Sequence, residues 1–249
     1  MCTVDTDVIV IIAGKFYDLL QQHPAADIWL AFGTGTKFRY IHINTMCSVL
    51  GIEKSIALPA FHSFTGCDTT STFFGIGKKS AWEAWKSFPE VTNAFLYIAS
   101  HPHTVVTIEC DHFKPLECFC VVIYNKTSNL EFVNEARKEL FCQKNRTMEA
   151  IPPTQDALLQ HCRRVAYQAG IWNTSNKAQQ DLPNPEGYGW KLSEECKWAA
   201  VWITLPVASK ACTELVKCSC KSSRGCGGRY ACKKAQWKCT ELCSCNCEK

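Results

Sequence analysis

Apolar runs and turns alternate along the first sixty residues in a way that predicts both strands and helices. Val8–Ile12 is an unbroken β-branched run, which is typical of a strand buried on both faces of a parallel sheet. Residues 15–22 have a helical pattern, and residues 38–43 alternate like a strand after a Gly-rich hairpin turn. Residues 48–58 predict a short helix that ends before Pro59. The expected fold class is therefore α/β.

Two further helices are expected around turns that contain glycine. The apolar residues of 58–64 share one helical face, and this helix is expected to end near Gly66 and to deliver Asp68 at a tight turn. Gly75–Lys79 is a Gly-x-Gly turn that leads into a second helix. The apolar face of this second helix consists of Ala81, Trp82, Trp85 and Phe88.

The middle of the chain is expected to be mostly helical. Two amphipathic stretches, 116–124 and 136–141, precede a third helix that Thr154 can N-cap. The outer face of this third helix is expected to carry three polar residues: His161, Arg163 and Arg164. Residues 173–190 are polar and rich in Pro and Gly, so they predict a linker or long loop.

These patterns divide the chain into four parts. Residues 1–100 hold the expected sheet and turns, 101–172 a helical extension, 173–206 a linker with a Trp-containing connector, and 207–249 a Cys-rich tail. With 47% hydrophobic residues, the body is long enough for one core. No apolar run is long enough to span a membrane. The chain opens on acids where a secretory leader is basic, so an intracellular protein is expected.

Eight of the 18 cysteines lie within residues 218–247. So short a stretch cannot build a hydrophobic core, which leaves either bound metal or disulfides to hold it together. The repeated C-x-C pairs favour metal, because cysteines two apart bridge poorly to each other but can both reach one Zn²⁺. The expected zinc ligands are Cys218, Cys220, Cys226, Cys232, Cys239, Cys243, Cys245 and Cys247. The other ten cysteines lack ligand spacing and are expected to be small buried hydrophobes in a reducing compartment.

The charge of the tail indicates a partner. Residues 207–249 contain nine Lys or Arg and three Glu, a net charge of +6, whereas the whole chain carries +4, so the body sums to −2. A cationic zinc module on a nearly neutral body suggests contacts with phosphates. The alternative is that the basic residues only keep a Cys-rich segment soluble.

The tail resembles the tesmin-type CXC module, a zinc domain that binds DNA. Cys218–Cys226 match the first C-x-C pair and the third ligand, and Cys232–Cys245 keep the family spacing. Tyr230 stands where the family has the first Cys of its second pair, and Cys247 ends the series one residue early. Eight thiolates can serve about two tetrahedral zinc ions. The alternative for Tyr230 is the family's DNA-contacting Tyr, displaced by one residue.

Asp5 and Asp7 stand directly before the predicted strand. Residues i and i+2 of a strand point to the same side, so both carboxylates are expected to face one place. Close carboxylates repel unless a cation lies between them, and Mg²⁺ is the usual one. The alternative is an acidic loop that caps the strand.

The turn at Gly75–Lys79 is a second candidate site. Glycines let backbone N–H groups approach a phosphate at the positive N-terminus of a helix, and Lys78 and Lys79 stand beside it. This arrangement predicts contacts with a nucleic-acid backbone that do not read the bases.

Residues 4 to about 95 resemble the flap-endonuclease and excision-repair 5′-nuclease family, which has a PIN-like fold. The matching motifs are DTDVIVII at 5–12, TGCDTT at 65–70 and GIGKKSA at 75–81, in the family's order. The resemblance implies that Mg²⁺ or Mn²⁺ binds to Asp5, Asp7 and Asp68. It also implies that a helix–two-turn–helix element grips DNA through Gly75, Gly77, Lys78 and Lys79.

The chain departs from this family ahead of Asp5. In the family, a strand with its own catalytic Asp, a lysine-bearing helix and an acidic E-x-[ED] pair precede the D-x-D motif. This chain begins at D-x-D, which implies an N-terminally truncated parallel sheet and about half of a two-metal site. The layout of D-x-D, TGCD, a PPTxxALLxHxxRxAYQAG helix and a Cys-rich tail also looks like a group of multicopy animal proteins.

Three functions remain open. The first is a nuclear protein, derived from a PIN-like nuclease, that binds DNA mostly through its phosphate backbone with weak or no catalysis. The second is an active Mg²⁺-dependent, structure-specific endonuclease completed by a further N-terminal segment or a second chain. The third is a zinc-stapled module for protein interaction. Because only three family aspartates are present, the sequence favours the first.

Overall fold

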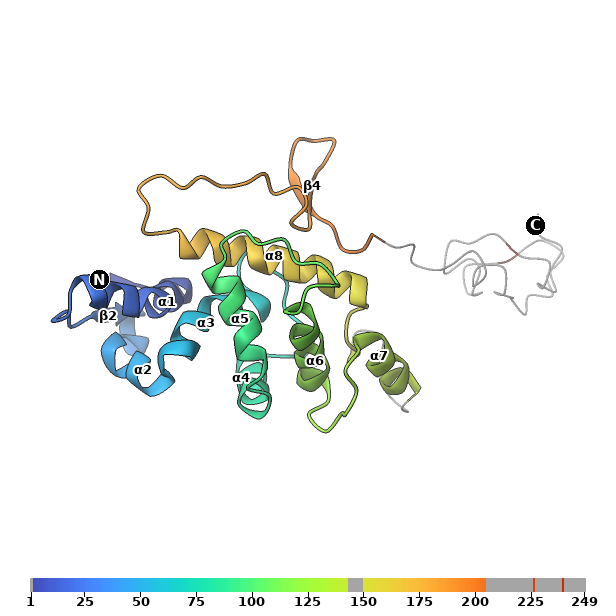
Figure 1. Ribbon diagram of the computed structural model, residues 1–249, viewed down its shortest axis with the longest axis horizontal. Coiled ribbons are helices and arrows are strands. Elements are labelled where there is room, and N and C mark those ends of the chain that lie inside the picture. Colours follow the sequence, from blue (N-terminus) through green and yellow to red (C-terminus); the bar gives the residue numbers. More distant parts are fainter. Residues whose placement is uncertain (1, 143–149, 205–225, 227–238, 240–249) are drawn as a thin grey trace. The chain divides into compact units, whose positions relative to one another are not determined.

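The computed structural model describes residues 2–142 and 150–204, together with Cys226 and Cys239 (Figure 1). The chain separates into two compact units, Met1–Ile203 and Thr204–Lys249. Within the described residues, the first unit holds eight α-helices, a small mixed sheet and a separate two-stranded hairpin, so the α/β class is confirmed. None of the described helices is both long and apolar enough to cross a membrane.

The mixed sheet has the strand order β1-β2-β3. β1 (Cys2–Thr3) pairs in parallel with β2 (Trp29–Phe32), and β2 pairs in antiparallel with β3 (Arg39–His42). A 3₁₀ turn at Gly35–Lys37 joins β2 to β3. The predicted hairpin and its second strand are therefore confirmed, and the sheet contains one parallel pair.

The predicted strand at Val8–Ile12 is wrong, because this run lies inside helix α1 (Thr6–Gln22). Asp5 is the N-cap, and its carboxylate accepts a hydrogen bond from the Asp7 backbone N–H at 2.9 Å. The buried residues of α1 follow the helical period across and beyond the run: Val10, Ala13 and Phe16. The β preference of branched residues is weak, and here capping and packing override it.

Two helices follow the sheet and meet at Gly51, whose φ is +79°. They are α2 (Ile43–Leu50) and α3 (Ile52–Phe64). The predicted helix end before Pro59 is wrong, because α3 runs through Pro59, which is buried against α1. A Cβ on Gly14 of α1 would lie 2.5 Å from the Pro59 Cγ, so the glycine allows α1 and α3 to pack closely here. The lost backbone hydrogen bond is thus offset by tertiary packing.

The expected helical middle is confirmed. It consists of α4 (Lys78–Ser87), α5 (Val91–Ser100), α6 (Phe113–Tyr124), α7 (Val133–Cys142) and α8 (Gln155–Asn173). Thr154 caps α8, since its hydroxyl accepts from the Ala157 N–H at 3.2 Å. Helix α8 packs against α3, α5 and α6 (Figure 1). The core between these helices is aromatic and includes Phe61, Phe64, Trp85, Phe95 and Phe119.

The chain returns over α8 after the long loop. Residues 174–189 form turns and irregular backbone, as predicted, and lead into the hairpin of β4 (Trp190–Leu192) and β5 (Trp198–Ala200). The loop is tied to the body, because the buried Tyr188 donates from its hydroxyl to the His103 carbonyl at 2.6 Å.

The expectation that α8 exposes His161 and Arg164 is wrong. His161 is 6% exposed, and its Nε2 hydrogen-bonds to the Phe64 carbonyl at 2.8 Å. Arg164 is 3% exposed and donates to the carbonyls of Gly189 and Val201 at 3.2 and 2.7 Å. His161 packs against Phe64 and Phe73, whereas Arg164 is covered by the returning segment. The helical pattern of α8 alone predicts neither contact.

The body cysteines agree only in part with the expected buried role. Cys47, Cys120 and Cys162 are buried and act as small core residues. Cys2 and Cys196 are exposed instead, as is Cys142 at the end of α7. Exposed thiols do not contribute to the core, so burial does not account for their presence.

Candidate functional site

The N-terminus of α1 carries the two predicted carboxylates. Asp5 is exposed and caps the helix, and the Asp7 backbone N–H binds its side chain. The Asp7 side chain lies 2.9 Å from His62 Nε2, and His62 comes from α3 and is 7% exposed. The sequence did not indicate this role for His62, since a single His in a helical apolar stretch gives no signal of such a pair.

The Asp7–His62 pair has a cationic neighbour in Lys78, the first residue of α4. The Lys78 ammonium donates to the His62 carbonyl at 2.9 Å, the Thr65 hydroxyl at 3.1 Å and the Gly66 carbonyl at 2.5 Å. The His62 carbonyl belongs to the last turn of α3, where carbonyl groups lack helical partners, and Gly66 directly follows the C-cap Thr65. Lys78 therefore caps α3, as basic side chains commonly do at this end of a helix.

Electrostatics favours a neutral imidazole at His62. Burial lowers the pKa of His62, and the positive charge of Lys78 lowers it further, whereas the hydrogen bond to Asp7 opposes both. Partial burial of the Lys78 ammonium lowers the pKa of Lys78, while the neighbouring Cys67 and Asp7 raise it. A neutral His62 ring can therefore donate a hydrogen bond from Nε2–H to the Asp7 carboxylate.

Asp68 lies at the tight turn that follows α3, as predicted, and its side chain is exposed. The turn depends on Gly66, whose φ is +103° and where a Cβ would lie 2.4 Å from a Thr72 methyl carbon. It is closed by the Cys67 N–H, which donates to the Thr70 carbonyl at 3.1 Å. The predicted position of Asp68 at a tight turn after α3 is therefore confirmed.

The three predicted aspartates do not form a metal-binding group in the structure. Asp5 and Asp7 are linked by the capping hydrogen bond, whereas Asp68 does not join them. Among the described residues, no three His, Cys, Asp or Glu side chains are placed to hold a metal ion. The carboxylates thus do not fit a two-ion site. Binding of one Mg²⁺ or Mn²⁺ ion by Asp5, Asp7 and Asp68 stays a prediction.

The Gly75–Lys79 turn has an open backbone. Gly75 has a φ of +73°, and a Cβ at Gly75 or Gly77 would meet no heavy atom within 4 Å. Gly77 is the N-cap of α4 and provides no side-chain hydrogen bond, so the first N–H groups of α4 keep their donor capacity. Lys79 is exposed beside them, whereas the Lys78 ammonium is directed to α3. The sequence could not distinguish the two lysines.

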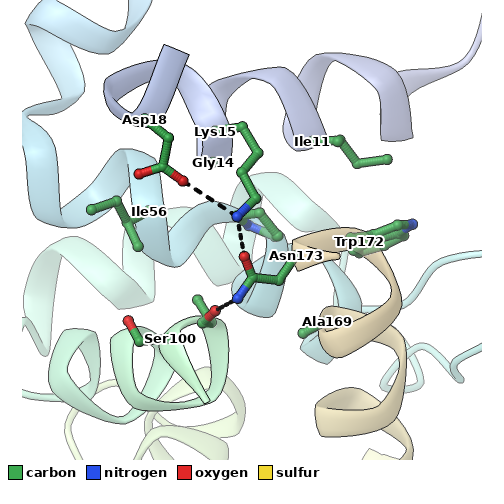
Figure 2. Close-up of a pocket in the computed structure, with 11 residues that line it drawn as sticks. Ile11, Gly14, Lys15, Asp18, Ile56, Ser100, Ala169, Trp172 and Asn173 are labelled. Atoms are coloured by element: carbon green, nitrogen blue, oxygen red, sulfur yellow. Dashed lines mark hydrogen bonds and ion pairs between the residues drawn. The ribbon is translucent and has the colours of Figure 1, made fainter. Parts of the chain in front are cut away.

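A cavity of about 230 Å³ lies among α1, α3, α5 and α8 (Figure 2). Lys15 donates to Asp18 at 3.3 Å and to the Asn173 amide oxygen, and Asn173 donates in turn to the Ala99 carbonyl. These bonds connect α1 to α8 and α8 to the end of α5. The Lys15 ammonium and the Asn173 amide thus both have partners, so we interpret these two residues as a structural clamp, which the sequence alone did not indicate.

The described part of the tail brings two predicted zinc ligands together. Cys226 and Cys239 are both buried, and their Sγ atoms lie 3.6 Å apart. A disulfide bond would require about 2.05 Å. Two thiolates that each lie about 2.3 Å from a tetrahedral zinc ion are about 3.8 Å apart. The separation therefore fits two ligands of one zinc ion.

The other predicted residues of the tail lie outside the described residues. They are Cys218, Cys220, Tyr230, Cys232, Cys243, Cys245 and Cys247. The resemblances to the 5′-nuclease family and to the CXC module therefore depend on the motif residues themselves. Comparisons with protein-family models, with curated proteins and with solved structures found no match for this chain.

Proposed function

We propose that this chain binds nucleic acid through the phosphate backbone, with a body derived from a PIN-like 5′-nuclease and a zinc-stapled basic tail. Cleavage activity is weak or absent. The observation that carries this proposal is the geometry of the Gly75–Lys79 turn. An open Gly-x-Gly backbone, an N-terminus of α4 without a side-chain cap and an exposed Lys79 meet at one place.

Each part of this turn favours a phosphate. Backbone N–H groups at a helix N-terminus attract anions through their unsatisfied donors and through the helix dipole. The absence of side chains at Gly75 and Gly77 lets a bulky phosphodiester approach the backbone closely. Lys78 stabilises the turn, because its ammonium links the start of α4 to the end of α3. Contacts of this kind position a nucleic acid and read no sequence.

The tail supports the same partner. Its net charge of +6 is large for 43 residues, and long-range attraction to polyanions follows from such a charge. The sulfur separation between Cys226 and Cys239 supports zinc as the element that holds the tail together. A nuclear location fits a protein with these properties.

The acidic end of α1 supports weak catalysis at most. Phosphodiester cleavage by two metal ions needs several ligands on ions that are about 3.5–4 Å apart. Asp7 is already paired with His62, and Asp68 does not complete a metal-binding group with Asp5 and Asp7 among the described residues. We therefore interpret this end of α1 as the remnant of a nuclease site that no longer supports efficient phosphodiester cleavage.

The salt dependence of duplex DNA binding tests the proposal. Fluorescence anisotropy over a NaCl series should give a steep slope of log K against log salt that depends little on sequence. Lys79→Ala should lower this slope by about one unit, because one phosphate contact is lost. Lys86→Ala is the matched control, since Lys86 is exposed at the other end of α4 and pairs with Glu83 at 2.9 Å. An unchanged slope for Lys79→Ala would show that the turn is not a phosphate site.

A further inference from the structure

A second cavity, of about 300 Å³, lies beside the loop that leads into the Gly75–Lys79 turn. Its walls are formed by this loop, by α8, by the end of α6, by the middle of α7, and by the returning segment at Trp202 and Ile203. The volume is at the lower end of the range of small-molecule sites. The function proposed above does not use this cavity.

The described walls of this cavity carry positive charge without a negative counterpart. Arg137 and Arg164 line it, and none of the described lining residues is Asp or Glu. Arg164 is 3% exposed and donates to two backbone carbonyls, and Arg137 donates to the Pro152 carbonyl. Neither guanidinium forms an ion pair within the described ranges. Arg164 is buried and Arg137 is half-buried, and charges withdrawn from water are normally paired, so this cavity is suited to an anion.

The same cavity presents flat aromatic surfaces. Phe74 and Trp202 line it and are 63% and 62% exposed, which is unusual for such large apolar side chains. The guanidinium of Arg164 lies 5.3 Å from the centre of the Trp202 ring and thus brings charge close to the aromatic surface. Ser71 and Thr72 add hydroxyl groups to the wall. An anion with an attached planar ring satisfies both features, whereas a simple inorganic anion uses only one.

We propose that this cavity binds one nucleotide unit, with its base against Phe74 and Trp202 and its phosphate at Arg137 and Arg164. Base stacking on aromatic side chains and paired hydrogen bonds from arginine to phosphate are the usual means of holding an unpaired nucleotide. Phe74 directly precedes Gly75, so a strand bound at the turn could place its next nucleotide here. The site rests on the nucleic-acid partner proposed above and adds an unpaired nucleotide to it.

Isothermal titration with thymidine 5′-monophosphate tests the site in the full chain. The nucleotide should bind more tightly than either thymidine or inorganic phosphate, because only the nucleotide uses the rings and the guanidinium groups together. Phe74→Ala and Trp202→Ala should each weaken binding about 5- to 150-fold, which corresponds to the stacking of one base. Trp198→Ala is the matched control, since Trp198 is 44% exposed on β5 but does not line the cavity.

Arg137→Lys provides a second test, because lysine keeps the positive charge but lacks the planar guanidinium that can donate two hydrogen bonds to one phosphate. This variant should bind the nucleotide with a smaller preference over thymidine than the wild type does. Equal binding by all variants, or no binding of the nucleotide to the wild type, would overturn the site. Duplex binding in the salt series is a separate measurement. Normal duplex affinity without nucleotide binding would refute the cavity alone, and nucleotide binding without duplex affinity would refute the proposed function alone.

Discussion

Acid should destabilise the body through His161. This residue lies on α8, is 6% exposed, and packs its ring against Phe64 and Phe73 with centroid distances of 5.4 and 5.2 Å. Burial lowers the pKa of His161 from 6.5 to about 4, the Phe64 carbonyl opposes this shift, and the charge of Arg164 adds to it. The folded protein therefore holds His161 as a neutral ring down to about pH 4.

The magnitude follows from the difference between the two pKa values. A difference of roughly 2.5 units corresponds to about 3.4 kcal/mol at 1.36 kcal/mol per unit. Because the folded pKa is the lower one, the unfolded chain binds more protons between pH 6.5 and 4. Stability should therefore decrease as the pH falls through 6.5, and the loss should be complete below about pH 4. The pKa of His62 is lowered in the same direction, so it adds to the decrease.

Urea unfolding of the wild type and of His161→Gln at pH 7, 6, 5 and 4 would measure this effect. Glutamine can donate to the Phe64 carbonyl but does not titrate, so the free energy of unfolding of the wild type should fall relative to the variant by about 3 kcal/mol from pH 7 to 4. Both proteins carry the same tail, and any loss of zinc in acid cancels in this difference. His23→Gln, at the exposed C-cap of α1, is the control. Parallel loss of stability in wild type and His161→Gln would refute the reasoning.

Three further outcomes are expected. Native mass spectrometry of the reduced chain should show about two Zn²⁺ ions, and Cys226→Ser combined with Cys239→Ser should remove about one of them, whereas Cys196→Ser should remove none. A zinc-free tail with four disulfides would contradict the zinc assignment. Gly14→Ala should destabilise the body by about 1–3 kcal/mol in thermal unfolding, because the added Cβ would lie 2.5 Å from Pro59. Gly77→Ala is its control: no atom lies within 4 Å of a Cβ there, so only the poorer N-cap preference of alanine should count, at about 1 kcal/mol or less. Flap DNA should not be cleaved appreciably with Mg²⁺, and robust incision that Asp68→Asn abolishes would restore the nuclease hypothesis.

The sequence predicted those elements whose signals are local. The start of α4 after Gly77 and the start of α8 after Thr154 are set by residues within one turn of the helix. The hairpin between β2 and β3 likewise depends on a short Gly-rich turn. The prediction of a strand at Val8–Ile12 was wrong because it depended on the β preference of this run alone. Asp5, just before the run, is an N-cap and starts a helix.

The candidate sites were predicted less well because they depend on distant parts of the chain. His62 lies 55 positions from Asp7 in the sequence, and only the packing of α1 against α3 brings the two side chains together. The burial of Arg164 results from the return of the chain at Gly189 and Val201. The residue pattern of α8 does not predict that the returning segment buries Arg164. The cavity lined by Arg137 and Arg164 could therefore not be anticipated from helical periodicity.

Lys78 connects the two parts of the body that carry the predicted chemistry. Its ammonium holds the last carbonyls of α3, its charge contributes to keeping His62 neutral beside Asp7, and its backbone begins the helix that follows the Gly75–Gly77 turn. A change at Lys78 therefore disturbs the acidic end and the basic turn together, whereas a change at Lys79 removes only an exposed charge. Weaker DNA binding by a Lys78 variant is thus not evidence of a phosphate contact. A lower salt slope for Lys79→Ala with unchanged stability is such evidence, because only a lost ionic contact changes one without the other.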